Sequence, residues 1–244
     1  MAASACAGEL SFVTEPFQPF SYEESPGTHV AAGPMADVVQ AVCQRIGKTC
    51  RMAVLPWRRA YAMAANGEVD GLFSIIRIPE REKDFYVSAM VAESAYGFFA
   101  AATSAFAYRR PEDLRDHIIA VYGPSGTSIA LDELVAATNQ PVRVVLDISN
   151  PTVLKKLAAG RYGEGDKVIA AMNREVGSYL TANEKIAGIK YVGDFRKISY
   201  GIGLSRKKVT PEQFAEFNNA LKTLIREGKV KAILDKYGLK PARD

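Results

Sequence analysis

Arg81 is the residue of this sequence best suited to binding a charged ligand. A guanidinium group is planar and permanently charged, so it can hold a carboxylate with two parallel hydrogen bonds. Each charge-assisted bond of this kind contributes about 1.5–3 kcal/mol. The residues around Arg81 include Glu80, Glu82 and Asp84. Arg81 therefore either anchors an anion or pairs with one of these neighbours on a solvated surface.

Thr127 and Ser128 offer a second place for an anion. They follow the turn Gly123-Pro124-Ser125-Gly126 at the predicted start of a helix. The first N–H groups of a helix have no partner within the helix, and the helix dipole favours negative charge there. The two hydroxyl groups could instead cap the helix. The segment lacks the spacing of a phosphate loop or of a nucleophile elbow.

Three cysteines are present, and two of them are close in sequence. Cys43 and Cys50 bracket the end of a predicted helix and the start of a strand, and they are either bridged or free buried thiols. A bridge around so short a loop would stabilise the fold by about 2–3 kcal/mol. Cys6 lies among small residues typical of signal-peptidase sites, so we expect a removed signal peptide, an oxidising compartment and hence the bridge. The same residues loosely resemble a lipoprotein box.

Composition and charge argue against several other functions. The 244 residues carry 31 Lys and Arg against 27 Asp and Glu, with the two signs interspersed. Nucleic-acid binders concentrate basic residues on one stripe, so we expect no nucleic acid partner. No apolar run approaches the roughly 20 residues that span a bilayer. His29 and His117 are far apart and form no metal signature with the cysteines, so we expect no metal and no cofactor.

Strands alternate with helices along the chain, which predicts parallel βαβ units and an α/β fold. The strands are expected over 10–14, 52–55, 69–76, 118–122 and 142–146. The helices are expected over 34–46, 57–66, 128–138, 149–160, 211–226 and 230–237. The runs 96–102 and 198–204 are extended without a helical period, and we expect them to cross between two lobes.

Several short motifs follow one another between about Glu9 and Leu239, and each occurs once. They are Pro19-Phe20-Ser21-Tyr22, the segment 33–39, Pro56-Trp57, the segments 66–71, 77–82 and 85–88, Gly126-Thr127-Ser128, and the segment 228–238. Each motif is weak alone, but the order and spacing of the set are specific. Together they resemble the family 3 periplasmic solute-binding proteins, the amino-acid-binding components of ABC importers.

The resemblance implies a two-lobed periplasmic-binding-protein-like fold of type II. Lobe 1 would comprise 9–99 plus 197–244 and lobe 2 would comprise 104–192, with hinge strands near 98–104 and 193–200. Ligand binding in such proteins closes the hinge around the solute. The resemblance also implies a disulfide between Cys43 and Cys50, as in histidine- and lysine-binding members.

The resemblance assigns roles to individual residues as well. Arg81 matches the arginine that pairs with the ligand carboxylate, and Thr127 and Ser128 match a second ligand contact. Tyr22 and Trp57 would lie on loops that face the ligand. Phe20, like Phe17, is expected equally to line the site or to pack in the core.

Two departures from the family pattern bear on the ligand. Arg77 stands next to a position where a small hydroxyl residue is common; it either faces the ligand, which would then carry extra negative charge, or decorates a strand end. The aspartate that usually binds the ligand amine should follow Gly160-Arg161, but an insertion occupies this segment. Asp166 or Glu164 are the substitutes. A carboxylate without an amine, or a peptide-like or modified ligand, is the alternative to an amino acid.

These features predict a monomeric periplasmic solute-binding protein and not an enzyme. It would capture a small carboxylate-bearing ligand by lobe closure and deliver it to the membrane permease of an ABC importer. Two other functions use the same scaffold. One is ligand sensing, and the other is an enzyme like the cyclohexadienyl dehydratases, which would need a general acid such as Glu164 or Glu175.

Overall fold

A computed structural model describes residues 8–138, 140–163, 165–183 and 186–243. The chain divides into two compact units, each mixed α/β, so the predicted fold class is confirmed. Unit 1 comprises Met1–Glu93 and Ser199–Asp244, and unit 2 comprises Ser94–Ile198. Strands β7 (Ala92–Ala101) and β11 (Ile189–Ser205) contain the two points where the chain passes from one unit to the other.

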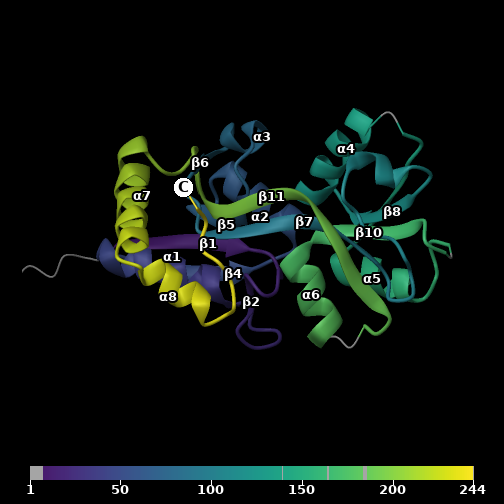
Figure 1. Ribbon diagram of the computed structural model, residues 1–244. Coiled ribbons are helices and arrows are strands. Elements are labelled where there is room, and N and C mark those ends of the chain that lie inside the picture. The colour runs from purple at the N-terminus through teal and green to yellow at the C-terminus, as the bar shows by residue number, and fades with distance from the viewer. Residues whose placement is uncertain (1–7, 139, 164, 184–185, 244) are drawn as a thin grey trace, which may run out of the picture. The chain divides into compact units, whose positions relative to one another are not determined.

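Unit 1 is built from short strands with helices between them. Its strands are β1 (Glu9–Thr14), β2 (Tyr22–Glu23), β3 (Ala31–Ala32), β4 (Thr49–Val54), β5 (Gly71–Ile75) and β6 (Phe85–Val87). Its helices are α1 (Pro34–Arg45), α2 (Trp57–Asn66), α3 (Pro79–Glu82), α7 (Pro211–Arg226) and α8 (Lys229–Asp235). Helices α1, α7 and α8 pack against one another (Figure 1).

The sheet of unit 1 has the order β4-β1-β5-β11, and β6 also pairs with β11. Strands β4, β1 and β5 are parallel, whereas β11 runs antiparallel to β5. Because α2 joins β4 to β5 and α3 follows β5, Trp57 and Arg81 both lie just beyond the carboxyl ends of parallel strands. Side chains that converge at this edge of a parallel sheet are typical of ligand sites.

Unit 2 repeats this construction. Its elements are the 3-10 helix η1 (Pro111–Leu114), strands β8 (Ile118–Tyr122), β9 (Arg143–Asp147) and β10 (Val168–Asn173), and helices α4 (Gly126–Thr138), α5 (Asn150–Ala158) and α6 (Arg174–Asn183). The sheet order is β7-β10-β8-β9, with β10, β8 and β9 parallel. Helix α4 covers one face, and α5 and α6 cover the other (Figure 1).

Local signals explain where several helices begin and end. Helix α2 ends at Gly67, whose φ of 80° is a left-handed conformation that glycine adopts without strain. Helix α7 begins with a capping box in which Thr210 and Gln213 bond each other's backbone N–H groups. Both helices have the bounds predicted from the sequence.

Elements without such signals were not predicted. Strand β10 is buried throughout and reads Val-Ile-Ala-Ala-Met-Asn, without the alternation of a half-exposed strand. Helix α6 contains Gly177, which lowers helix propensity, and this glycine packs against Phe99. Helix α3 and strand β6 are only four and three residues long.

Candidate functional site

Arg81 is a buried arginine in α3, with only 8% of its surface exposed. Its guanidinium carbon lies 5.0 Å from the centre of the Trp57 ring, which is a cation–π contact. Trp57 begins α2 and packs edge-on against Tyr61, with ring centres 5.7 Å apart. Two elements that are far apart in sequence therefore hold the guanidinium in a partly apolar environment, where its interaction with an anion is stronger than in water.

Glu15 is the titratable group most affected by this environment. It directly follows β1 and is half-buried. Burial raises the pKa of Glu15 to about 8, although the charge of Arg81 acts to lower it. Burial, together with a hydrogen bond to Asp84, also raises the pKa of Tyr61 to about 12, again opposed by Arg81. Glu15 is not among the residues predicted from the sequence, although a polar residue directly after a strand is the signal that marks it.

Ser74 has a backbone conformation that sequence reasoning could not detect. It lies near the carboxyl end of β5 with φ of 66°, in the left-handed region that a serine rarely adopts. Its Oγ is 3.5 Å from Ser21 Oγ, which lies 3.2 Å from Thr14 Oγ1. Ser21 also donates to the carbonyl of Glu15 at 3.0 Å. Backbone strain of this kind concentrates at binding and catalytic sites.

The structure places Arg77 against the backbone of its own unit. Its Nη2 donates to the carbonyls of Val87 and Ser88 at 3.0 and 2.9 Å, and its Nη1 donates to Glu82 at 3.0 Å. Arg77 therefore ties the segment after β5 to the end of β6. The charge of Arg77 is therefore paired with that of Glu82, and two backbone carbonyls of unit 1 accept its other hydrogen bonds.

The aromatic candidates are distributed over different parts of unit 1. Phe20 is fully buried and packs with Phe17 and Tyr200, with ring centres 5.0–5.5 Å apart. In this arrangement Phe20 contributes to the core. Tyr22 is half-buried in β2 and lies against Gly33, where a Cβ would come within 2.9 Å of its ring. Trp57 is the candidate that contacts Arg81.

In unit 2, Thr127 and Ser128 lie in the first turn of α4. The hydroxyl of Ser128 accepts from the N–H of Ser125 at 2.8 Å, and Ser125 Oγ accepts from the N–H of Ser128 at 3.1 Å. Ser125 thus caps the start of α4, and Ser128 closes the turn that precedes the helix. Thr127 is 9% exposed and takes no part in these bonds.

Asp166 lies at the other end of the same sheet. It precedes β10, whereas Thr127 follows β8, and these neighbouring strands are parallel. A strand of five or six residues is about 17–20 Å long, so the two residues belong to opposite edges. Asp166 is exposed and accepts a hydrogen bond from the N–H of Ala105 at 3.2 Å. Glu164, the other substitute, lies outside the described residues.

The carboxyl end of β9 carries a buried carboxylate that sequence reasoning missed. Asp147 accepts from Lys156 Nζ and Tyr162 Oη, each at 2.6 Å, and from the N–H of Ile148 at 2.7 Å. Burial acts to raise the pKa of Asp147, but the bonds from Lys156 and Tyr162 hold it below the ordinary value. The inserted segment therefore supplies Tyr162 to this cluster.

Cys43 and Cys50 are paired as a disulfide in unit 1, with their Cα atoms 6.1 Å apart. The bridge joins α1 to β4 and does not touch Arg81. Cys6 lies outside the described residues. Within the described residues, no group of three or more His, Cys, Asp or Glu side chains could hold a metal ion.

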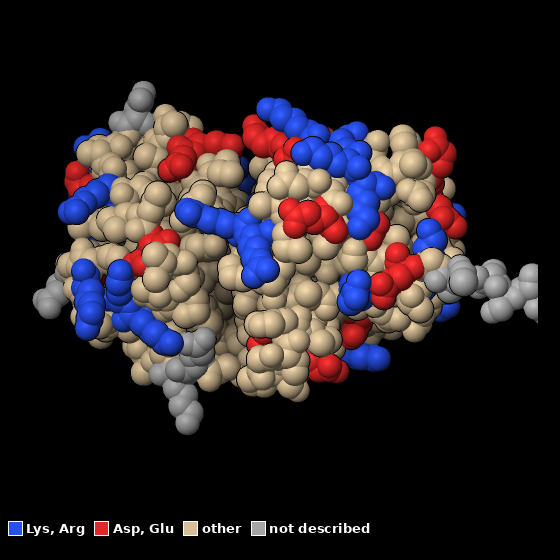
Figure 2. Space-filling view, turned by 180° about the vertical axis from the view of Figure 1, so that it is seen from behind, with Lys and Arg blue, Asp and Glu red and all other residues tan. Residues whose placement is uncertain are grey.

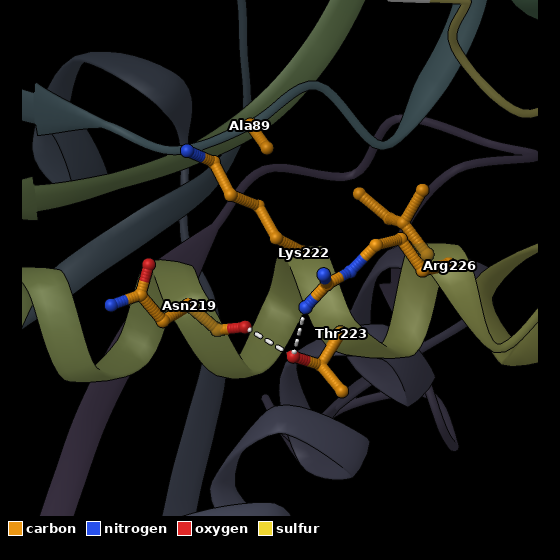
Figure 3. A pocket seen from close by; sticks show the side chains of 6 residues that line it. Ala89, Asn219, Lys222, Thr223 and Arg226 are labelled. Atoms are coloured by element: carbon orange, nitrogen blue, oxygen red, sulfur yellow. Dashed lines mark hydrogen bonds between the residues drawn. The ribbon is translucent and has the colours of Figure 1, made fainter.

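A surface cavity of about 500 Å³ lies beside α7 in unit 1 (Figure 3). It is lined by Ala89, Asn219, Lys222, Thr223, Ile225 and Arg226. Lys222 extends towards Ala89, and Arg226 turns back to donate to Thr223 Oγ1 at 3.1 Å (Figure 3). Both cations lie in the last two turns of α7, where the helix dipole favours positive charge. The six residues that line this cavity do not include any of the predicted ligand residues.

The surface charges are mixed. On the face shown in Figure 2, Lys and Arg are scattered among Asp and Glu and do not form a single basic stripe. No helix in the described parts of the chain combines the length and the apolar character needed to cross a membrane.

Comparison with known proteins gives one family. The family described as bacterial extracellular solute-binding proteins, family 3, matches residues 10–240. A search of curated proteins finds no match.

Solved structures of this fold are similar over most of the chain. A histidine kinase sensor domain with similarity to periplasmic binding proteins has a TM-score of 0.82 at 20% identity, covering 97% of this chain and 99% of that one. An amino acid ABC transporter substrate-binding protein from Streptococcus pneumoniae, bound to L-arginine, has a TM-score of 0.77 at 16% identity and 94% coverage of both chains. An ancestral amino-acid-binding protein, a precursor of cyclohexadienyl dehydratase, has a TM-score of 0.76 at 18% identity, covering 94% and 95%.

Proposed function

Because the chain belongs to the bacterial extracellular solute-binding proteins of family 3, we propose that it binds a small carboxylate-bearing solute. We propose further that the two lobes close on this solute and that the protein delivers it to the permease of an ABC importer. In this proposal the protein is exported, acts as a monomer in the periplasm and catalyses no reaction. Lipidation at Cys6 would attach it to a membrane.

The observation that carries the proposal is the buried position of Arg81 against Trp57, just beyond the parallel strands of unit 1. An anion that reaches a guanidinium held beside an aromatic ring and away from bulk water interacts with it more strongly than with an exposed arginine. A ligand carboxylate would supply two acceptors in the geometry that the guanidinium fork favours. We place Thr127 and Ser128 in the unit 2 part of the site, because they begin α4 beyond the carboxyl end of β8.

The experiment is a thermal-shift screen with small carboxylates on the purified protein. A ligand at 100 times its Kd stabilises the folded state by about 2.7 kcal/mol, which is easily measured as a rise in Tm. Arg81→Ala should remove this rise. Arg51→Ala is the matched control, since Arg51 is an exposed arginine of unit 1 that pairs with Glu9 at 3.1 Å. A rise retained in the Arg81 variant would contradict the proposal.

Ligand sensing is the second candidate, because a kinase sensor domain shares this fold with 99% of its own length covered. A sensor would bind its ligand without delivering it. Import assays in cells that lack the gene separate the two functions, since uptake of the identified ligand falls only if the protein serves a transporter.

Catalysis is the third candidate. A dehydratase needs a general acid whose pKa lies near the working pH. Glu15, with a pKa of about 8, fits this requirement in unit 1. Turnover of prephenate or arogenate by the purified protein, abolished by Glu15→Gln, would establish this activity and contradict the binding-only proposal.

A further inference from the structure

We propose that the surface cavity beside α7 binds the phosphate group of a small phosphate monoester. All six residues that line the cavity belong to unit 1, so the site is complete within one unit. Its volume of about 500 Å³ lies within the range of roughly 300–1,000 Å³ that is typical of small-molecule sites. None of the six residues belongs to the carboxylate site, so this inference is independent of the proposed function.

Helix α7 supplies one wall of the cavity. Asn219, Lys222, Thr223 and Arg226 are spaced three or four residues apart, which puts their side chains on one face of the helix. The buried residues of α7 lie on the opposite face, and they are Phe217, Ala220, Leu221 and Leu224. Residues four apart on a helix have Cβ atoms about 5–6 Å from each other, so Lys222 and Arg226 can reach the same anion.

The segment between β6 and β7 supplies the other wall. The N–H of Ala89 donates to Asn218 Oδ1 at 2.7 Å, and its carbonyl accepts from Ser88 Oγ at 2.8 Å. Ser88 Oγ also accepts from the N–H of Ile202 in β11 at 3.0 Å. These bonds fix the wall to α7 and to β11 and use both backbone groups of Ala89. The groups that hold a ligand must therefore come from the side chains of α7.

The two cations of the cavity have no carboxylate partner in the described parts of the chain. The lining residues include no Asp or Glu. Glu227 directly follows Arg226, but its carboxylate is paired with Arg45 and, at 3.1 Å, with Lys229. A hollow lined by charge of one sign raises the local concentration of ions of the other sign. Lys222 and Arg226 therefore favour an anion as the occupant.

The donors and the size of the cavity indicate which anion. A phosphate monoester carries a charge of about −1.5 to −2 at pH 7 and three acceptor oxygens, so one group can pair with both cations. Lys222 extends towards Ala89, and Arg226 donates one of its N–H groups to Thr223 Oγ1 (Figure 3). Ala89 and Ile225 add apolar side chains to the lining. They would contact the organic part of the ester, for which a bare phosphate ion has no counterpart.

Calorimetry in phosphate-free buffer at constant ionic strength tests the proposal on the whole protein. The probes are phenyl phosphate and glycerol 3-phosphate, with benzoate and inorganic phosphate as comparisons. The parent and Arg81→Ala are both measured, so that carboxylate binding at the other site is recognised. We expect at least one ester to bind both proteins equally. In Arg81→Ala that ester should bind about tenfold more tightly than benzoate, and more tightly than inorganic phosphate, because it satisfies both cations.

A pair of lysine variants tests whether the cavity is the binding site. Lys222→Met should weaken ester binding about tenfold, because it removes one charge-assisted partner of the phosphate. Lys236→Met is the matched control, since Lys236 is an exposed lysine at the carboxyl end of α8 and does not line the cavity. Its Kd should equal that of the parent. Both lysines are exposed, and thermal unfolding confirms that each variant is folded.

Several outcomes would overturn the proposal. Equal weakening in the two lysine variants would show a general effect of charge. Loss of ester binding in Arg81→Ala would place the phosphate at the carboxylate site. Inorganic phosphate that binds as tightly as both esters would indicate a site for the ion alone, and failure of both esters to bind would exclude the site. None of these results bears on whether the protein binds a carboxylate through Arg81, which the thermal-shift screen decides.

Discussion

At the scale of single residues, Arg81 is the group that interacts with the other members of the candidate site in unit 1. It lies against Trp57 and acts on the pKa values of both Glu15 and Tyr61. Asp84 and Glu15 have different surroundings. Asp84 accepts a hydrogen bond from Tyr61, whereas desolvation is the largest influence on Glu15 and raises its pKa to about 8.

The raised pKa of Glu15 predicts that stability falls as the pH rises. The folded state holds this proton up to about pH 8, whereas the unfolded chain releases it near the ordinary value of 4.5. Folding therefore takes up a proton between these values, and the free energy of unfolding decreases with pH by at most about 1.4 kcal/mol per unit.

Urea unfolding at pH 5 and pH 8 measures this effect. Glu15→Gln keeps the shape but cannot ionise, so this variant should lose the Glu15 contribution to the difference between the two pH values. A variant with the same pH dependence as the parent would show that Glu15 ionises normally.

At the scale of elements, the strand ends decide which residues meet. Parallel pairing of β8 with β10 brings Thr127 and Asn173 to one edge and leaves Asp166 at the other. The disulfide acts at this scale too, because it links the end of α1 to the start of β4 through a sequence separation of seven. It constrains the edge of the unit 1 sheet and takes no part in the group around Arg81.

The bridge predicts a thiol count and a stability change. Of the three cysteines, one should react with a thiol reagent when the protein is unfolded without reduction. The double variant Cys43→Ala, Cys50→Ala should lose about 2–3 kcal/mol of unfolding free energy, because the unfolded chain gains loop entropy. Its ligand affinity should be unchanged. A count of three thiols would show that the bridge does not form.

At the scale of the whole molecule, the chain passes twice between two units that each have their own sheet and core. Such proteins close by rotation about the connecting strands when a ligand contacts both units. Binding would then stabilise backbone in both units at once, even though their cores are separate.

Hydrogen exchange tests this expectation with the ligand found in the screen. At saturation, amides around Arg81 in unit 1 and around Thr127 in unit 2 should both exchange more slowly than in the free protein. Amides of α7 serve as the internal reference, since the helix lies apart from the proposed ligand residues in sequence and carries none of them. Protection confined to one unit would contradict closure on the ligand.

Sequence patterns alone were enough for the family, the α/β class and most elements, because the periodicities that report them are local. Helices α2 and α7 could be placed from their apolar spacing and their caps. The choice of Arg81 rested on its charge, its planar fork and the surrounding motif. The same local signals were too weak for β10, which is buried throughout, and for α6, which contains a glycine.

Tertiary structure decided the properties that depend on strand order and burial. The separation of Asp166 from Thr127 follows from the parallel register of β8 and β10, which no short segment encodes. The raised pKa of Glu15 follows from desolvation by burial, which exists only in the folded chain. The sequence left two alternatives open for Arg77, and its bonds to Val87 and Ser88 depend on a fold in which β5 and β6 both pair with β11. The residue type sets the charge and the hydrogen-bonding groups of a side chain. The fold decides which neighbours those groups contact, and therefore the pKa and the hydrogen-bond partners.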